Sequence, residues 1–171
     1  MAEENDSFEL ILMVFDDPKR ASDVLPILSK MEKEGKFQLY NTAIIYKDRQ
    51  GITNATEPQD VRPWRGSIFG MLVGALVGLI GGPAGVIVGA AAGAVTGGAA
   101  ARKIDLGFSD NYLKEVTQAL QPDSSAILVL VEQKWVDSLV AELSRFGGGI
   151  FRHLMKADVV ERLKNQQELT G

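Results

Sequence analysis

A long uncharged run of glycine, alanine and aliphatic residues, from Gly66 to Ala101, constrains this chain more than any other feature. Within it, glycine recurs at every fourth position in two series. A spacing of four places the members of one series on nearly the same face of a helix. The two series are Gly66, Gly70, Gly74 and Gly78, followed by Gly85, Gly89, Gly93 and Gly97. Because glycine has no side chain, such a face lets a second helix backbone approach closely.

The run predicts a helical hairpin whose two arms pack glycine face against glycine face. Between the two series stands Gly81-Gly82-Pro83, a strong turn signal, since proline fits the first turn of a following helix better than a helix interior. Each arm has roughly 15 to 18 residues, or about 22 to 27 Å of helix. A bilayer core is about 30 Å thick, so each arm is marginal as a membrane span.

The two arms differ in composition, and this difference leaves two environments open. The first arm has enough large apolar side chains to face lipid, whereas the second is mostly alanine and glycine and fits better under a cover of protein. Glycine lowers helix propensity by about 1 kcal/mol relative to alanine, so neither arm is expected to form alone in water. We therefore expect insertion in or packing on a membrane, with burial between the subunits of a soluble assembly as the alternative.

Basic residues border the run at both ends, and a tryptophan stands just before it. A hairpin with both ends in the cytoplasm is expected to carry positive charge at both ends, and tryptophan anchors segments at the membrane interface. The flanking residues are Arg62, Trp64, Arg65, Arg102 and Lys103. This pattern favours a cell-membrane location with both termini in the cytoplasm, and a cytoplasmic protein is the alternative.

Charge and composition exclude several classes of protein. The chain has 171 residues, a net charge of −4 and a pI near 5.1, which argues against a nucleic-acid partner. It has no cysteine, so disulfides and iron–sulfur clusters are excluded. The acidic N-terminus lacks the basic and apolar regions of a signal peptide, which predicts a cytoplasmic N-terminus.

Strand and helix patterns stand on both sides of the run. Short apolar or alternating segments predict strands, and apolar residues at helical spacing after capping residues predict helices. The predicted strands are 8–15, 37–47, 52–57, 126–131 and 150–156, and the predicted helices are 18–33, 109–121, 133–146 and 157–168. Pro26 is expected to kink or divide the first helix. The strand 126–131 has no polar residue, so we expect it to be central and buried on both faces.

The order of these elements predicts an α+β fold. Two strand-helix-strand units are typical of a ferredoxin-like antiparallel sheet, for which we expect helices on one face. The glycine-rich hairpin is then an insertion between two halves of one domain. The predicted boundaries are 1–62 for the first half, 63–103 for the glycine-zipper hairpin, and 104–171 for the second half.

Few residues suggest chemistry. Asp16 and Asp17 resemble a metal pair, but adjacent acids before a helix are far more often caps. His153 is the only histidine, which favours a packing or surface role. The glycines 147–149 follow a predicted helix, so they indicate a C-cap rather than a phosphate-binding loop. With no catalytic motif, we expect a non-enzymatic protein without a cofactor or a metal.

Three stretches carry a resemblance to a known family. They are VFDDPKRA after the first predicted strand, LGFSDNYLKEVTQALQPDSSAILVLVE, and FGGGIFRHLMKADVVERL. With these stretches, the chain resembles the small bacterial proteins of unknown function grouped as DUF1269, which are regarded as membrane proteins. The resemblance extends from about Phe8 to Leu163. It implies the architecture and the membrane association, and it brings no established activity.

These observations lead to a functional expectation with two alternatives. We expect a non-enzymatic, membrane-associated homo-oligomer in which the hairpin meets the membrane and a ferredoxin-like domain lies in the cytoplasm. Its expected partners are copies of itself and membrane lipid. One alternative is a soluble homo-oligomeric or shell-like assembly with the hairpins buried between subunits. The other is a small-ligand regulatory module, which rests on fold analogy alone.

Overall fold

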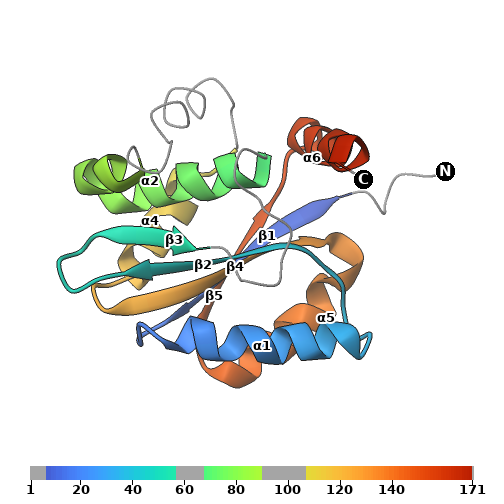
Figure 1. The fold of residues 1–171 in the computed structure, drawn as a ribbon, viewed down its shortest axis with the longest axis horizontal. Coiled ribbons are helices and arrows are strands. Elements are labelled where there is room, and N and C mark those ends of the chain that lie inside the picture. Colours follow the sequence, from blue (N-terminus) through green and yellow to red (C-terminus); the bar gives the residue numbers. More distant parts are fainter. Residues whose placement is uncertain (1–6, 57–67, 90–106, 171) are drawn as a thin grey trace.

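The computed structural model describes residues 7–56, 68–89 and 107–170, and they form an α+β fold built on a five-stranded antiparallel sheet (Figure 1). The strand order is β3-β2-β4-β1-β5. The strands are β1 (Phe8–Phe15), β2 (Leu39–Lys47), β3 (Thr53–Thr56), β4 (Ser124–Glu132) and β5 (Gly149–Leu154). The helices are α1 (Arg20–Lys33), α2 (Ile68–Gly89), α4 (Asp110–Ala119), α5 (Gln133–Leu143) and α6 (Ala157–Thr170), with a 3₁₀ turn at Ser144–Phe146.

Strand β4 is the middle strand of the sheet, and the expectation that it is buried on both faces is confirmed. It pairs antiparallel with β1 on one side and with β2 on the other. Leu128 lies opposite Leu12 of β1 and Ala43 of β2 on one face, while the next residue, Val129, belongs to the core on the other face. Because successive side chains alternate between two buried faces, every position of this strand interior is apolar.

Helices α1 and α5 cover one face of the sheet (Figure 1). Their buried residues, such as Leu28 and Leu139, pack on Ile11, Met13 and Val129. Pro26 lies inside α1, which is a single helix and is not divided there. Pro26 is exposed to solvent, so water can reach the backbone where the helical hydrogen bond is lost.

Asp17 acts in the turn before α1, although the N-cap residue of the helix is Lys19 and not Asp17. Its Oδ1 accepts hydrogen bonds from the backbone N–H groups of Lys19 and Arg20, at 2.7 Å and 3.2 Å. The helix begins at Arg20 rather than at Pro18, so Asp17 closes the turn that leads into it. The carboxylate thus has a structural role next to the helix start, though not as the N-cap itself.

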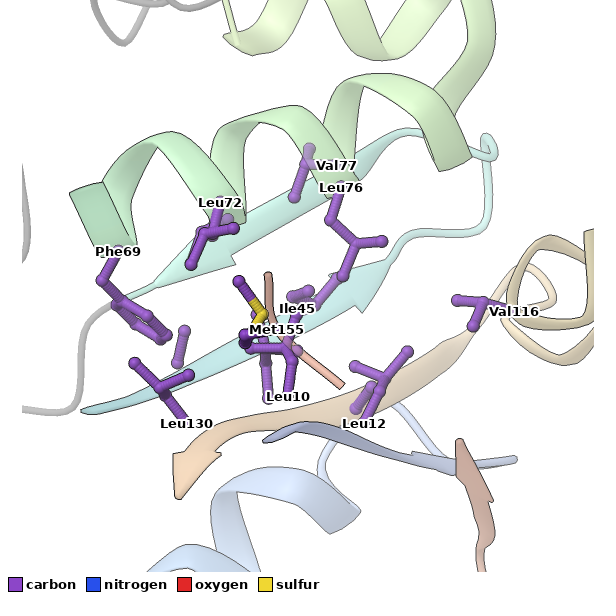
Figure 2. Packing of buried hydrophobic residues seen from close by; sticks show 14 of the residues in the cluster. Leu10, Leu12, Ile45, Phe69, Leu72, Leu76, Val77, Val116, Leu130 and Met155 are labelled. Carbon is purple, nitrogen blue, oxygen red and sulfur yellow. The ribbon is translucent and has the colours of Figure 1, made fainter. Parts of the chain in front are cut away.

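The first part of the glycine-rich run packs on the opposite face of the sheet as α2. Phe69, Leu72 and Leu76 point from α2 toward Leu10 and Ile45 of the strands (Figure 2). Helices α4 and α6 complete this second layer (Figure 1). The expectation of helices on one face is therefore wrong. The sheet has two apolar faces, and the large side chains of the run recur at helical spacing and cover the second one.

Helix α2 continues through Gly81-Gly82-Pro83 to Gly89, so the turn predicted at these residues is not observed. Proline removes one helical hydrogen bond, but an established helix can continue through it with a kink. A Cβ added at Gly81 would lie 3.6 Å from Cβ of Thr53, so α2 passes directly over β3 before it reaches the proline. The start of the predicted second arm, up to Gly89, therefore belongs to α2, and a hairpin with its turn at Gly81-Gly82-Pro83 is not confirmed. The remainder of that arm falls in residues 90–106, outside the described residues.

Ser124 and Ser125, at the start of β4, connect this strand to neighbouring segments through hydrogen bonds. Ser125 is fully buried, and its hydroxyl accepts a hydrogen bond from the Ala21 N–H at 3.1 Å and donates one to the Asp17 carbonyl at 2.5 Å. The Ser124 hydroxyl donates to the Gln121 carbonyl. These bonds join the middle strand to the first turn of α1 and to the loop that precedes β4.

The substitution Ser125→Ala tests this connection. It leaves the Ala21 N–H buried without its acceptor, so we expect the free energy of unfolding to fall by about 1 to 3 kcal/mol. Urea unfolding monitored by circular dichroism measures the change. Ser138→Ala is the control, because Ser138 is exposed on α5; an equal loss in both variants would contradict the role of Ser125.

Candidate functional site: the outer face of α2

The face of α2 that points away from the sheet has no charged side chain and no hydroxyl group among its described residues. This outer face consists of Gly70, Met71, Gly74, Ala75 and Gly78, of which Met71 and Ala75 also pack against the core cluster at its border. Gly74 is exposed and the other four are half-buried. At its border lies Leu79, whose side chain is 55% exposed.

The glycines of this face leave room for close contact. Among the described residues, no atom lies within 4 Å of a Cβ added at Gly74 or at Gly78. The absence of a side chain is therefore not needed for packing within the described part of the chain. It leaves the helix backbone accessible, which is the geometry that small residues provide at helix–helix contacts.

The composition of the outer face is unusual for a helix on a protein surface. Such a helix normally presents polar residues to solvent, and α1 does so with Ser22, Asp23 and Lys30. In α2, by contrast, the inner face is buried on the sheet and the outer face is also apolar. A helix that is apolar all round is normally buried all round. The outer face can therefore take up a second helix or another apolar surface.

The structure brings together only part of the residues that the sequence singles out. Gly70, Gly74 and Gly78 share one face, as their spacing predicts. Gly85 and Gly89 lie in the same helix rather than in an opposing arm. Gly85 follows Gly78 by seven residues, close to two helical turns, so a continuous helix extends the same stripe. Outside the described residues lie Gly66, Gly93, Gly97, Arg62, Trp64, Arg65, Arg102 and Lys103.

A second group of interacting side chains surrounds a buried carboxylate where β1 pairs with the edge strand β5. Glu9 of β1 is 5% exposed. Its Oε2 accepts a hydrogen bond from Arg152 Nε at 2.8 Å, and its Oε1 accepts from Arg152 Nη2 at 2.9 Å and from Gln133 Nε2 at 3.0 Å. This group is not among the residues expected from the sequence, although a lone glutamate inside an apolar strand is a signal that it needs a partner.

The partners of Glu9 decide its charge. Burial acts to raise its pKa, but the hydrogen bonds from Arg152 and Gln133 lower it, and the net pKa lies below the ordinary value. The same contact raises the pKa of Arg152. Both groups therefore stay ionised at neutral pH and neutralise each other, so the pair suits a structural role better than proton transfer.

His153 lies in a group of three rings with Phe108 and Tyr112. The ring centroid of His153 is 4.8 Å from that of Phe108 and 5.3 Å from that of Tyr112. Burial raises the pKa of Tyr112, whose hydroxyl finds no hydrogen-bond partner among the described residues. These contacts agree with the interpretation of His153 as a packing residue.

Two further findings concern the described residues alone. No cluster of three or more potential metal ligands occurs in 7–56, 68–89 and 107–170. Over the same ranges, none of the helices combines the length and the apolar character that crossing a membrane requires.

Comparison with known proteins adds one match. A family model described as "Protein of unknown function (DUF1269)" matches residues 65–168, which include α2 with its outer face and all later elements up to α6. Two of the three stretches behind the sequence resemblance lie inside this range, and VFDDPKRA lies before it. No curated protein and no solved structure matches the chain.

The substitution Glu9→Gln tests the buried pair. We expect it to lower the free energy of unfolding at pH 7 by roughly 1 to 3 kcal/mol, because Arg152 loses its charged acceptor. The pKa of Glu9 is lower in the folded chain than its ordinary value of 4.5. Its contribution is therefore complete above that value and is lost as the pH falls through the folded pKa.

The difference between wild type and Glu9→Gln should accordingly be largest at neutral pH and shrink in acid. Urea unfolding at pH 7 and at pH 3 measures both differences. Glu161→Gln, at an exposed position of α6, is the matched control. A Glu9→Gln difference that stays constant across this pH range would contradict the assignment.

Proposed function

The chain belongs to the DUF1269 family of proteins of unknown function, and we propose that it is a non-enzymatic protein that associates with copies of itself through the outer face of α2. One observation carries this proposal. The inner side of α2 is buried on the sheet, while its outer side is equally uncharged and, in the described part of the chain, has open space over Gly74 and Gly78. Contact with a second copy removes this apolar surface from water.

Self-contact suits this face because of its charge and its repeat. In a two-fold symmetric dimer the same patch lies on both sides of the interface, so a charged patch would meet its own charge. The outer face carries no charge, so two copies can meet without repulsion. The period of four from Gly70 to Gly78 lets two such helices approach closely along about two turns.

The fold proposed for the subunit is ferredoxin-like, with β3 as an added edge strand. With β3 set aside, the order is β2-β4-β1-β5. Helix α1 connects β1 to β2, and α5 connects β4 to β5. Both connecting helices pack on the same face of the sheet, which supports the double strand-helix-strand arrangement. In this proposal α2 is an additional helix that covers the opposite face.

A membrane-associated homo-oligomer is the second candidate. The uncharged composition from Gly66 to Ala101 and the basic residues that border it support this candidate. The burial of Phe69, Leu72 and Leu76 on the sheet counts against it, because these side chains are then not in contact with lipid. For this reason the protein–protein contact is the first candidate.

Two substitutions at Gly74 separate folding from association. Gly74→Ala is expected to raise the free energy of unfolding by up to about 1 kcal/mol, because alanine is the better helix former and the site is open. Gly74→Leu should also keep the fold, but its side chain holds the two backbones apart. We expect it to raise the dissociation constant of the oligomer about tenfold or more, that is by at least about 1.4 kcal/mol.

Analytical ultracentrifugation of the full chain measures this association, and circular dichroism confirms the fold of each variant. Ala141→Leu is the matched control, because it adds the same side chain at an exposed position of α5. We expect it to leave the association unchanged. If Gly74→Leu keeps the oligomer size of the wild type, the proposed contact is wrong.

Fractionation of cells that make the full chain decides between the two candidates. For the first candidate we expect an oligomer that stays in the supernatant after ultracentrifugation. The second candidate requires that the protein stays with the membrane pellet through washes with high salt and with carbonate. That result would replace the first candidate with the second.

A further inference from the structure

Strand β5 is an edge of the sheet, and no strand of the described chain pairs with its outer side. In the described residues, β5 pairs with β1 alone and stands last in the strand order. The N–H of Met155 donates to the Phe8 carbonyl at 2.9 Å, which shows which backbone groups face β1. Backbone N–H and C=O groups alternate in direction along a strand. Those of Ile150, Arg152 and Leu154 therefore lie in the plane of the sheet and point outward from its open edge.

The side chains of β5 do little to prevent pairing with another strand. Edge strands are usually protected by free charges, proline or bulges. The one permanent charge in the middle of β5, Arg152, is bound to Glu9 through two hydrogen bonds and is neutralised there. Leu154 is 59% exposed, which is the largest exposure of any large apolar residue in the described chain. The opposite edge, β3, has only four residues, Thr53–Thr56.

We infer that β5 pairs with β5 of a second copy of this chain, antiparallel and about a two-fold axis at Arg152. In this register Ile150 lies opposite the partner's Leu154, and Phe151 lies opposite the partner's His153. Residues opposite each other in an antiparallel pair share one face of the sheet. The pairing therefore places apolar residues against each other on the α1 and α5 face, and aromatic rings on the other face.

This register also suits the hydrogen-bonding groups of the backbone. Ile150, Arg152 and Leu154 all direct their N–H and C=O groups outward, and the register sets each of them opposite an outward-directed residue. Each such pair can exchange two hydrogen bonds. The two arginines at the centre do not repel strongly, since each carries its own Glu9 carboxylate. The exposed Leu154 becomes covered, and the two sheets join into one.

A second copy is the occupant because the strand complements itself. The apolar pair and the aromatic pair each form twice from a single six-residue segment, and no free charge has to be buried. This surface is separate from the outer face of α2, and the inference does not depend on the proposed function. The two contacts lie on different elements, so variants in one leave the other unchanged.

Engineered disulfides test the pairing and its register, since the chain has no cysteine of its own. Opposite residues in a hydrogen-bonded antiparallel pair have Cα atoms about 5.5 Å apart, which suits a disulfide. The double variant Ile150→Cys/Leu154→Cys should therefore form a covalent dimer on mild oxidation. Each single variant is a matched control, because its two cysteines lie about 14 Å apart in this register.

The readout is the mass of the full-length chain on a non-reducing gel, with circular dichroism to confirm folding. We expect the mass to double in the double variant and to stay that of one chain in both single variants. Adding Gly74→Leu to the double variant should not change this result. The inference is overturned if the double variant stays monomeric, if either single variant crosslinks to the same extent, or if Leu154→Lys leaves the wild-type association unchanged.

Discussion

Burial of both faces of one antiparallel sheet is the constraint on which the rest of this structure depends. Antiparallel sheets often leave one face in water, but β1 and β4 carry large apolar side chains on both sides. Two helical layers are therefore required. Helices α1 and α5 supply one, and the uncharged helix α2 supplies most of the other (Figure 1).

The requirement for two layers explains why the most hydrophobic segment of the chain lies in the domain rather than apart from it. The large residues of α2 cover the sheet, and Gly70, Gly74 and Gly78 remain on the outside. A helix with this division has no polar side to present to water. The proposed self-association through the outer face follows from this arrangement, as does the alternative of contact with lipid.

The polar groups inside the molecule serve the same two-layered core. Ser125 connects β4 to the start of α1, and Glu9 is held by Arg152 and Gln133 at the edge of the sheet. The pairing of Arg152 has a further effect, because it removes the free charge that normally protects an edge strand. A structural ion pair thereby leaves β5 suited to pairing with a second copy.

Local patterns in the sequence were sufficient for most elements, because alternation, helical spacing and capping residues act within a few residues of each other. They located β1 and the buried middle strand β4, and they placed Gly70, Gly74 and Gly78 on one helix face. The same patterns could not decide what covers that helix. Phe69 and Leu72 are equally favourable against lipid and against Leu10, so only the position of the open sheet face selected the protein core. The same limit applies to three other features. Residues distant in the chain decide whether the helix continues through Pro83, whether helices cover one or both faces of the sheet, and which side chain binds Glu9.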